Sequence, residues 1–558
     1  MVADQCEDGD AEDAHNLEAA SPSDIDSSSD CSDEDEDENG DMHHDRWHCC
    51  RRICICAVNN SSCSKWMLSN YRTWYTGVVV LLMVLGGVTL WLLDPEGLGP
   101  CNALFLSVSA VSMTGLSTVD FGSRPISVHL ISGMLIVLGS PMLMSLWPVI
   151  LRWRLLQQQR FSTEGERGAA FFGIKTSRGQ DSLALEIVLK TVFLYWLFCQ
   201  LLCWLILSWA SGSGGMWNAM FLTTSAWHNA GLLTHDLPFA SGKTSGLVLT
   251  IVMLLILGGN SCFPLALRFL IWLQWRCARG EHRRHVLSLL LRYPRTCYTH
   301  IFPEYATHWL AFVTPALTAV QIMSLCLVDF WALPAGREKS VPGIMQGLST
   351  ADKLWAILFQ SISTRTAGLS VVDLSLISPT SALIFMVCMW ISICPVIVVM
   401  RSTANRFSGT RLEYSSAIDK GQHQEAVLKN QLQTFLSENS FLLLSLLFLI
   451  LLGEEYADTE EVIRESRFMK ILFEFASAYG TVGLSMSSEP WSACGNWTTF
   501  SKVCLMPVML LGRLRGLPES IDPVVQLSLT DFEALTENEK EPTKRPIRAG
   551  DRTHSTPW

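Results

Sequence analysis

Charged residues are scarce in this chain: Asp, Glu, Lys and Arg make up 17% of its 558 residues, whereas 49% are hydrophobic. Soluble domains carry about 25% charged residues, so this composition is too apolar for a water-exposed surface. The sequence also lacks a GxxxxGK[ST] phosphate-binding motif and any convincing pair of zinc half-sites, and no cofactor is expected. A basic nucleic-acid binder is excluded as well, since the net charge is −11. The composition predicts a membrane protein with several spans.

Basic residues are missing from residues 1–45, which hold 18 Asp and Glu. Such a Ser-rich acidic segment cannot bury apolar surface, which predicts a disordered cytoplasmic tail. Residues 46–71 form a basic, Cys-rich segment next to the first apolar run. Cys49 and Cys50 there are candidates for S-acylation, with an unmodified loop as the equal alternative. A second cytoplasmic tail is expected over residues 514–558.

Apolar runs long enough to cross a bilayer recur along the chain. Seven are clear and an eighth is short: 72–93, 126–151, 185–210, 246–273, 307–331, 379–400, 437–453 and 498–512. Lys and Arg gather in alternate loops, at 46–72, 152–178, 268–295 and 401–429 and again after Arg513. Because positive residues stay inside, we expect an even number of spans and two cytoplasmic termini.

Four segments between these runs resemble one another. Each begins with apolar residues and Phe, continues through small hydroxyl residues and ends in Gly-Leu: LFLSVSAVSMTGLSTV (104–119), MFLTTSAWHNAGLLT (220–234), LFQSISTRTAGLSVV (358–372) and LFEFASAYGTVGLSMS (472–487). This periodicity indicates an internal repeat of helix, re-entrant segment and helix. The repeats are expected at 72–151, 185–273, 307–400 and 437–513.

Re-entrant backbone at membrane depth survives only where it lines water or is buried in protein. A short helix followed by an extended strand with Gly at its turn can aim carbonyl oxygens at a passing cation. Thr481, Val482 and Gly483 match the first three residues of a potassium filter strand. The predicted fold is therefore an all-α membrane protein with four helix–pore loop–helix repeats, eight transmembrane helices, and one pseudo-fourfold central pore.

The chain resembles the Trk/Ktr/HKT superfamily of potassium and sodium transporters, and most closely its fungal Trk and plant HKT branch. The residues that carry the likeness are SMTGLSTVD (112–120), LFQSISTRTAGLSVVDL (358–374), LFEFASAYGTVGLS (472–485), LLGRLRGLPESID (510–522) and CPVIVVMRSTAN (394–405). The resemblance implies a selectivity filter at four glycines and the residues before them: Thr114, Gly115, Ala230, Gly231, Ala367, Gly368, Val482 and Gly483.

The resemblance also implies which ion passes and what restrains it. Sodium-selective plant relatives have Ser at the position of Gly115. Glycine at this position favours potassium, and sodium permeation is left open. By this resemblance, Arg513 would form a positive barrier under the filter. Pro395 would lie in a broken inner helix that acts as a gate. For Arg515, a snorkelling anchor is the preferred interpretation. Relatives often form dimers with one pore per subunit, so a homodimer is expected by analogy.

The expected function is uptake of potassium, with possible sodium transport, across the plasma membrane by a multi-pass protein that is not an enzyme. The alternative is a sodium-selective or sodium–potassium symporting HKT-type transporter. Remote alternatives are a receptor or scaffold that signals through the acidic tail, and an intramembrane enzyme using His228 with Ser225. His228 is expected to be a structural hydrogen-bonding group, and Arg365 a brace behind its pore loop. Asn496 lies in a glycosylation sequon on the expected outer side.

Gly97 lies in the outer loop that precedes the first Gly-Leu segment. Replacing it with Ser is expected to have no effect, so the sequence favours Gly97→Ser as the control for Gly115→Ser.

Overall fold

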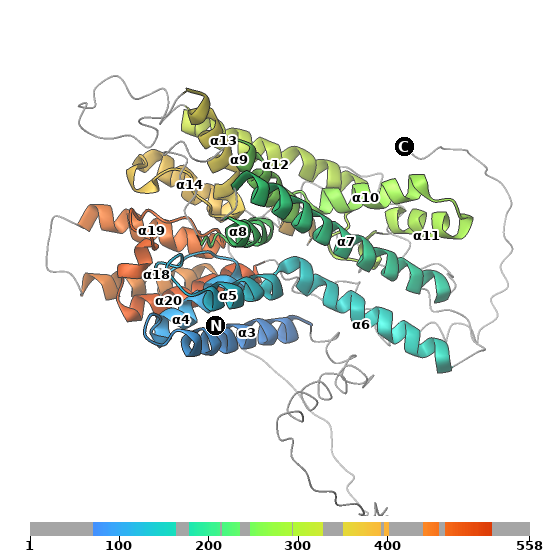
Figure 1. Cartoon of the computed structure of the whole chain (residues 1–558), viewed down its shortest axis with the longest axis horizontal. Helices are drawn as coiled ribbons and strands as arrows, with labels where there is room; N and C mark the ends of the chain where they lie inside the picture. Colours follow the sequence, from blue (N-terminus) through green and yellow to red (C-terminus); the bar gives the residue numbers. More distant parts are fainter. Residues whose placement is uncertain are drawn as a thin grey trace, which may run out of the picture. The chain divides into compact units, whose positions relative to one another are not determined.

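The computed structural model describes residues 71–162, 178–211, 215–234, 246–292, 294–326, 350–391, 395–400, 439–456 and 464–515. All of these lie in one compact unit, residues 57–558. The described residues are almost entirely helical and contain no strand (Figure 1). The predicted acidic tail, the Cys49–Cys50 pair and nearly all of the C-terminal tail lie outside the described residues.

The first group of helices consists of α3 (Tyr71–Leu93), α4 (Pro100–Ser112), α5 (Ile126–Gly139) and α6 (Pro141–Ser162). α4 packs between α3 and α5. It begins at a proline, whose missing N–H and fixed φ suit the first helical position. Its last turn ends in a left-handed residue, so the chain turns away from the helix axis after Ser112.

The second group has the same order: α7 (Arg178–Ser211), α8 (Met216–His228), α9 (Gly246–Gly259) and α10 (Phe263–Cys277). The short α8 packs against α7 and α9, as α4 does against its neighbours. An amphipathic helix, α11 (Glu281–Arg292), and a 3₁₀ turn, η1 (Pro294–Thr296), connect this group to the next.

The third and fourth groups complete the pattern. The third contains α12 (Glu304–Leu325), α13 (Thr350–Thr366), η3 (Leu374–Leu376), α14 (Pro379–Ile391) and a helical stretch at 395–400. The fourth contains α18 (Ser440–Glu455), α19 (Arg464–Gly480), η5 (Ala493–Asn496) and α20 (Thr499–Leu514). α19 contacts α14 of the third group, and α20 contacts α4 of the first, so the fourth group lies between them in the packing.

Only part of the predicted set of spans forms long straight helices. Among the described residues, three helices are long and apolar enough to cross a membrane: Arg72–Leu93, Ser182–Ala210 and Glu304–Leu325. A fourth candidate, Pro379–Met400, runs over residues 392–394, which lie outside the described residues. Two further candidates are bent pairs, α5 with α6 at 54° and α9 with α10 at 80°. Pro141 has no backbone N–H to continue the helix, which accounts for the first bend. α18 and α20 coincide with the two remaining predicted spans, but each has only 16 residues.

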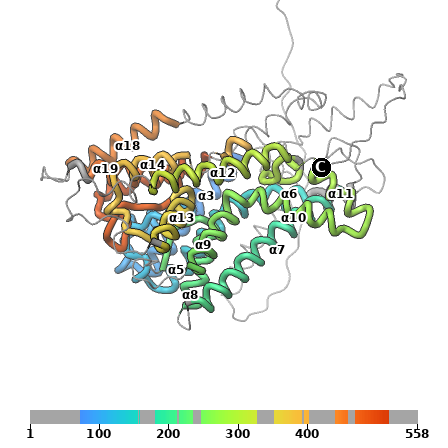
Figure 2. Tube along the Cα trace, turned by 90° about the horizontal axis from the view of Figure 1, so that it is seen from above, coloured from blue at the N-terminus to red at the C-terminus, as the bar shows by residue number. Residues whose placement is uncertain are grey.

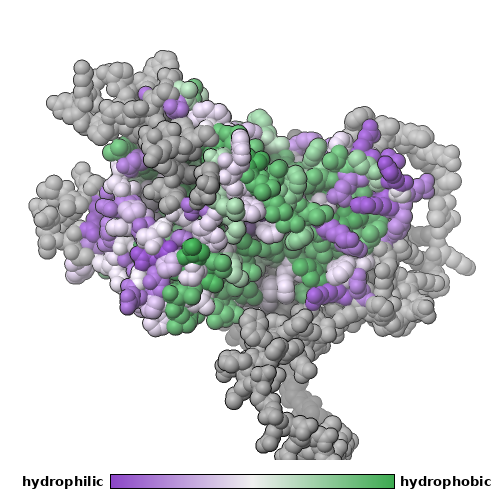
Figure 3. All heavy atoms as spheres, in the orientation of Figure 1, coloured by the Kyte–Doolittle hydropathy of each residue, from purple (hydrophilic) through white to green (hydrophobic). Residues whose placement is uncertain are grey.

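Large apolar side chains cover the outside of these helices. Figure 3 shows them as a hydrophobic region between a polar end near α19 and a polar end near α10 and α11. They come from every group: Leu81, Leu92, Phe198, Trp209, Leu254, Phe312, Leu383, Phe441 and Phe448 are among those more than a third exposed. So much exposed apolar surface would be unfavourable in water, whereas hydrocarbon accommodates it.

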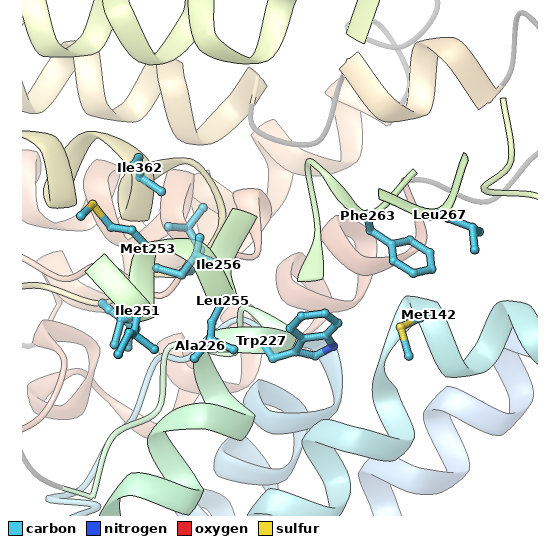
Figure 4. Close-up of a cluster of buried hydrophobic side chains, with 14 of the residues drawn as sticks. Met142, Ala226, Trp227, Ile251, Met253, Leu255, Ile256, Phe263, Leu267 and Ile362 are labelled. Atoms are coloured by element: carbon cyan, nitrogen blue, oxygen red, sulfur yellow. The ribbon is translucent and has the colours of Figure 1, made fainter. Parts of the chain in front are cut away.

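Two large buried clusters hold the short helices in place. One surrounds Trp227 at the end of α8 and reaches α6, α9, α10 and α13; Figure 4 shows Trp227 with Met253, Ile256 and Phe263 nearby. The other joins α3, α4, α5, α19 and α20 around buried Phe105 and Leu505. The ends of α4, α8, α13 and α19 are therefore fixed by packing on several sides, which gives the loops after them a rigid foundation.

Candidate functional site

The four short helices end in closely related ways. After α4, α8 and α19, one residue adopts left-handed backbone geometry: Met113 at φ 59°, Asn229 at φ 56° and Thr481 at φ 52°. The next residue then donates its N–H to a serine carbonyl five residues back, at 2.9 to 3.0 Å. This cap satisfies carbonyls that the helix end would otherwise leave without partners.

The third group reaches its glycine by a shorter path. α13 continues through Thr366, and both Ala367 and Gly368 donate their N–H groups to the carbonyl of Ser363, at 2.9 and 3.1 Å. No left-handed residue precedes Gly368, so its loop is one residue shorter than the other three. The general pattern of the four segments does not reveal the shorter loop. The distance from each glycine back to its hydrogen-bonded serine does reveal it, because this distance is shorter for Gly368 than for the other three glycines.

The glycines at the ends of the four similar segments are the only described glycines with positive φ. The angles are 83° at Gly115, 77° at Gly231, 66° at Gly368 and 95° at Gly483. Side chains rarely tolerate this conformation, and glycine adopts it freely. The prediction that these turns need glycine is therefore consistent with the backbone geometry at all four positions.

These four turns contact one another in a closed order. A side chain on Gly115 would overlap the carbonyl oxygen of Ala230, and one on Gly231 would lie 2.9 Å from that of Ala367. A side chain on Gly368 would overlap the carbonyl oxygen of Val482, and one on Gly483 would overlap that of Thr114. Each glycine thus faces the carbonyl that precedes the next glycine. The structure brings together all eight residues predicted to line a filter.

Hydrogen bonds brace these turns from behind. Thr366 donates its hydroxyl to Asn229 Oδ1 at 2.7 Å, which joins the second and third groups. Ser117, two residues after Gly115, pairs with Ser492 through its N–H at 3.0 Å and its carbonyl at 2.8 Å. This second contact joins the first and fourth groups. The turns are therefore held across their boundaries as well as by their own helices.

Further glycines allow the later helices to approach the short helices closely. A side chain on Gly139 would overlap the carbonyl of Val111, and one on Gly259 would overlap that of Trp227. A side chain on Gly512 would likewise overlap the carbonyl of Tyr479. In each case the contacted residue lies four positions before a glycine with positive φ. These contacts place the ends of α5, α9 and α20 directly beside three of the four turns.

A cavity of about 150 Å³ lies beneath the turns. Residues from the ends of all four short helices line it, and so do polar side chains of later segments: Ser112, Met113, His228, Asn229, Thr366, Thr481, Asn260, Thr299 and His300. Val396, Ile397 and Met400 of the third group also contribute to the lining. None of the described lining residues is Asp or Glu, and Arg513 brings a positive charge.

Arg513 and Arg515 lie in different surroundings. Arg513 borders the cavity and donates from Nη2 to the carbonyl of Gly139, at the bend between α5 and α6. Arg515 is only 5% exposed and donates to the carbonyls of Gly480 at 3.2 Å and Trp390 at 3.0 Å. The expectation that Arg515 snorkels as an anchor was wrong, because helix-end carbonyls hold its guanidinium inside the protein.

Pro395 begins the helical stretch that leads to Val396, Ile397 and Met400 in the cavity lining. Residues 392–394 lie outside the described residues, so the predicted break at this point stays a prediction. Val396 and Val399 of this stretch also belong to a buried cluster with Phe302 and Leu310.

Arg365 and His228 both act as structural donors or acceptors, as predicted. Arg365 donates from Nη1 to the carbonyl of Thr314 at 3.1 Å, so it braces α13 against α12. His228 is buried, and its Nδ1 lies 3.0 Å from Ser140 Oγ. The hydroxyl of Ser225 has no hydrogen-bond partner among the described residues. These contacts do not assemble the nucleophile and base that an intramembrane enzyme would need.

Comparison with known proteins gives a consistent result. Residues 48–533 match the family model TrkH, described as cation transport protein. The chain is 29% identical to potassium transporter TRK1 of Candida albicans, over 62% of this chain and 34% of that protein. It is 32% identical to potassium transport protein 1 of Schizosaccharomyces pombe, over 56% of this chain and 36% of that protein.

The chain therefore spans about a third of the length of these relatives. Among solved structures, the potassium transporter TrkH from Vibrio parahaemolyticus is similar with a TM-score of 0.49 and 15% sequence identity. That match covers 83% of this chain and 85% of the other.

Proposed function

Because this chain belongs to the TrkH family of cation transport proteins, we propose that it carries potassium ions across the plasma membrane through a filter formed at Gly115, Gly231, Gly368 and Gly483. The family match confirms the resemblance seen in the motifs, and the family consists of transporters rather than enzymes. The observation that carries the proposal is the closed order in which each glycine faces the carbonyl before the next one.

Carbonyl oxygens can replace the water around a monovalent cation when several of them surround its path. The carbonyls of Thr114, Ala230, Ala367 and Val482 supply four such oxygens at one level of the proposed path. The short helices end next to them, and a helix C-terminus carries a partial negative charge that favours a cation. In this proposal, backbone groups provide the attraction, and acidic side chains are not required.

The proposed architecture has four helix–pore loop–helix repeats and eight transmembrane helices around one pore. Support comes from the similar order of helices in the four groups and from the exposed apolar side chains of each. Both termini are placed in the cytoplasm, because basic residues gather in alternate loops. A homodimer with one pore per subunit is part of this proposal only by analogy with relatives.

Potassium is the proposed ion for two reasons. The fungal relatives are named as potassium transporters, and Gly115 leaves the first filter wall without a side chain. A sodium-selective or sodium–potassium symporting transporter is the alternative, and its signature would be a reversal potential that follows sodium.

Arg513 is proposed as a positive barrier below the filter, and the segment that begins at Pro395 as a gate. Arg513 borders the cavity beneath the four turns, where its charge would raise the energy of a cation. Val396 and Ile397 line the same cavity, so a movement of their segment would change its width.

The test is growth of potassium-uptake-deficient yeast on low potassium, followed by reversal potentials in potassium and sodium. The full chain is expected to restore growth, whereas Gly483→Ala should not, because the added methyl would overlap the carbonyl of Thr114. Gly280→Ala is the matched control, since no atom lies within 4 Å of its added methyl. Restored growth by Gly483→Ala at equal surface expression would contradict the filter.

A further inference from the structure

A groove lies between α7 and the corner formed by α10 and α11, away from the four filter turns. Its volume is about 300 Å³. Leu183, Ile187 and Leu194 of α7 supply apolar lining, while Lys190 of α7 and Arg283 of α11 supply positive charge. The three helices are in contact, and Figures 1 and 2 both show them side by side. The groove therefore combines an apolar part with a basic part.

Positive charge is concentrated beside this groove. Four exposed arginines fall within nine residues at the end of α10 and the start of α11: Arg276, Arg279, Arg283 and Arg284. None of them forms an ion pair with another described residue. Lys190 is paired with Glu186 at 2.5 Å, yet its side chain remains 69% exposed. Glu186, the one acidic residue among the described lining residues, thus offsets only part of the positive charge.

The helices fix these arginines at the boundary of the apolar surface. Val286, Leu287 and Leu290 anchor α11 in the buried core, which leaves its first turn exposed. Exposed Phe269 and Trp272 lie on the preceding helix α10, within eight residues of Arg276. Aromatic residues next to basic residues are typical of a membrane–water interface.

We propose that this groove binds one anionic phospholipid of the cytoplasmic leaflet. The phosphate would lie between Lys190 and Arg283, because a guanidinium group recognises phosphate oxygens through paired hydrogen bonds. An acyl chain would follow the apolar side chains of Leu183, Ile187 and Leu194. The proposal requires the basic end to face the cytoplasm, but it does not depend on which ion the protein transports.

Gln274 shapes the floor of the groove. Its Nε2 donates to Thr191 Oγ1 at 2.8 Å, and both residues belong to the lining. This bond links α7 to α10 between the basic and apolar parts. The groove is therefore a fixed feature of helix packing, and a lipid would not have to open it.

The experiment measures lipid retention by the purified full-length protein with native mass spectrometry. Phosphatidylserine and phosphatidylcholine are titrated separately into the detergent-solubilised protein. One phosphatidylserine per chain is expected to be retained in preference to phosphatidylcholine. The double variant Lys190→Gln, Arg283→Gln should bind phosphatidylserine about 30-fold more weakly, since each basic residue near an anionic lipid contributes about a factor of five. Arg283→Lys in place of Arg283→Gln should recover part of this loss.

Arg72→Gln is the matched control, because Arg72 is an exposed arginine at the start of α3 and does not line the groove. It should retain the lipid like the parental chain, and millimolar inorganic phosphate should not displace the lipid. Equal retention by the double variant, equal loss in Arg72→Gln, or displacement by free phosphate would each overturn the proposal. The experiment measures lipid binding and not ion flux. A negative result would therefore overturn the lipid proposal without affecting the proposed transport function, which has its own test.

Discussion

The carbonyl oxygen of Ala230 occupies the space that a side chain on Gly115 would need. The two residues belong to different helix groups, so this contact joins two of the four turns. It also means that any residue other than glycine at position 115 must displace a neighbouring carbonyl, quite apart from the strain of its positive φ.

Gly115→Ser is therefore expected to change ion selectivity. The hydroxymethyl group would push the Ala230 carbonyl out of line and disturb the potassium site, so the K⁺/Na⁺ permeability ratio should fall. Reversal potentials in mixed potassium and sodium measure the change. A variant that reaches the membrane with the parental ratio would remove Gly115 from the filter.

The control for this variant must be chosen from the structure. Gly97→Ser, expected from the sequence to be silent, is unsuitable, because an added side chain would meet those of Asp94 and Arg124. Gly99 is a better choice, since no atom lies within 4 Å of its added methyl and it caps the start of α4. Ser is also a favourable N-cap residue. Gly99→Ser should keep the parental ratio.

Arg513→Gln is expected to raise single-channel conductance or weaken rectification several-fold. The proposed reason is electrostatic: a unit charge about 8 Å from a cation costs about 2 kcal/mol at an effective dielectric constant of about 20. Gln can still donate to the carbonyl of Gly139, so the loss is mainly of charge. Arg513→Lys keeps the charge and should behave like the parental protein. Equal currents in all three proteins would assign Arg513 to packing alone.

Arg515→Met should reduce the amount of folded protein without altering selectivity. It removes donors to the carbonyls of Gly480 and Trp390 and the stacking of the guanidinium 4.5 Å from the Tyr479 ring. Hydrogen bonds from charged donors contribute about 1.5–3 kcal/mol each, so the expected loss of stability is at least 2 kcal/mol. Surface expression and thermal unfolding measure the loss, and exposed Arg72→Met serves as control. An altered K⁺/Na⁺ ratio would contradict a purely structural role.

Both termini are expected to lie in the cytoplasm. Epitope tags at residues 20 and 550 should be inaccessible to antibody in intact cells and accessible after permeabilisation. The physical reason is the retention of Lys- and Arg-rich loops on the cytoplasmic side. Labelling of only one tag in intact cells would mean an odd number of spans.

The four glycines with positive φ were predictable because the requirement for glycine is local. A left-handed turn after a short helix needs glycine, and the Gly-Leu pairs mark it in the sequence. The shorter third loop was missed because the segments were compared by their general pattern rather than by the distance from Gly368 back to Ser363. The cyclic order of contacts was beyond a sequence argument, since it depends on packing between helices that are far apart in the chain.

Arg515 shows a different limit. A basic residue after an apolar run usually reaches water, and nothing near it in the sequence indicates otherwise. Its partners are carbonyls at Gly480 and Trp390, which belong to α19 and α14. Only the tertiary arrangement brings these helix ends to one place. The bend at Pro141, in contrast, carries a recognisable local signal that a hydropathy window does not detect.

The closed order of the four turns has a consequence for how such a site can evolve. In a homotetrameric channel, a single codon change alters all four walls of the pore at once, and most such changes would abolish ion conduction. Here each wall has its own codons, so Gly115 can be exchanged while Gly231, Gly368 and Gly483 stay as they are. In the proposed pore, ion preference can therefore change one wall at a time, and the third wall already differs from the others because its loop is one residue shorter.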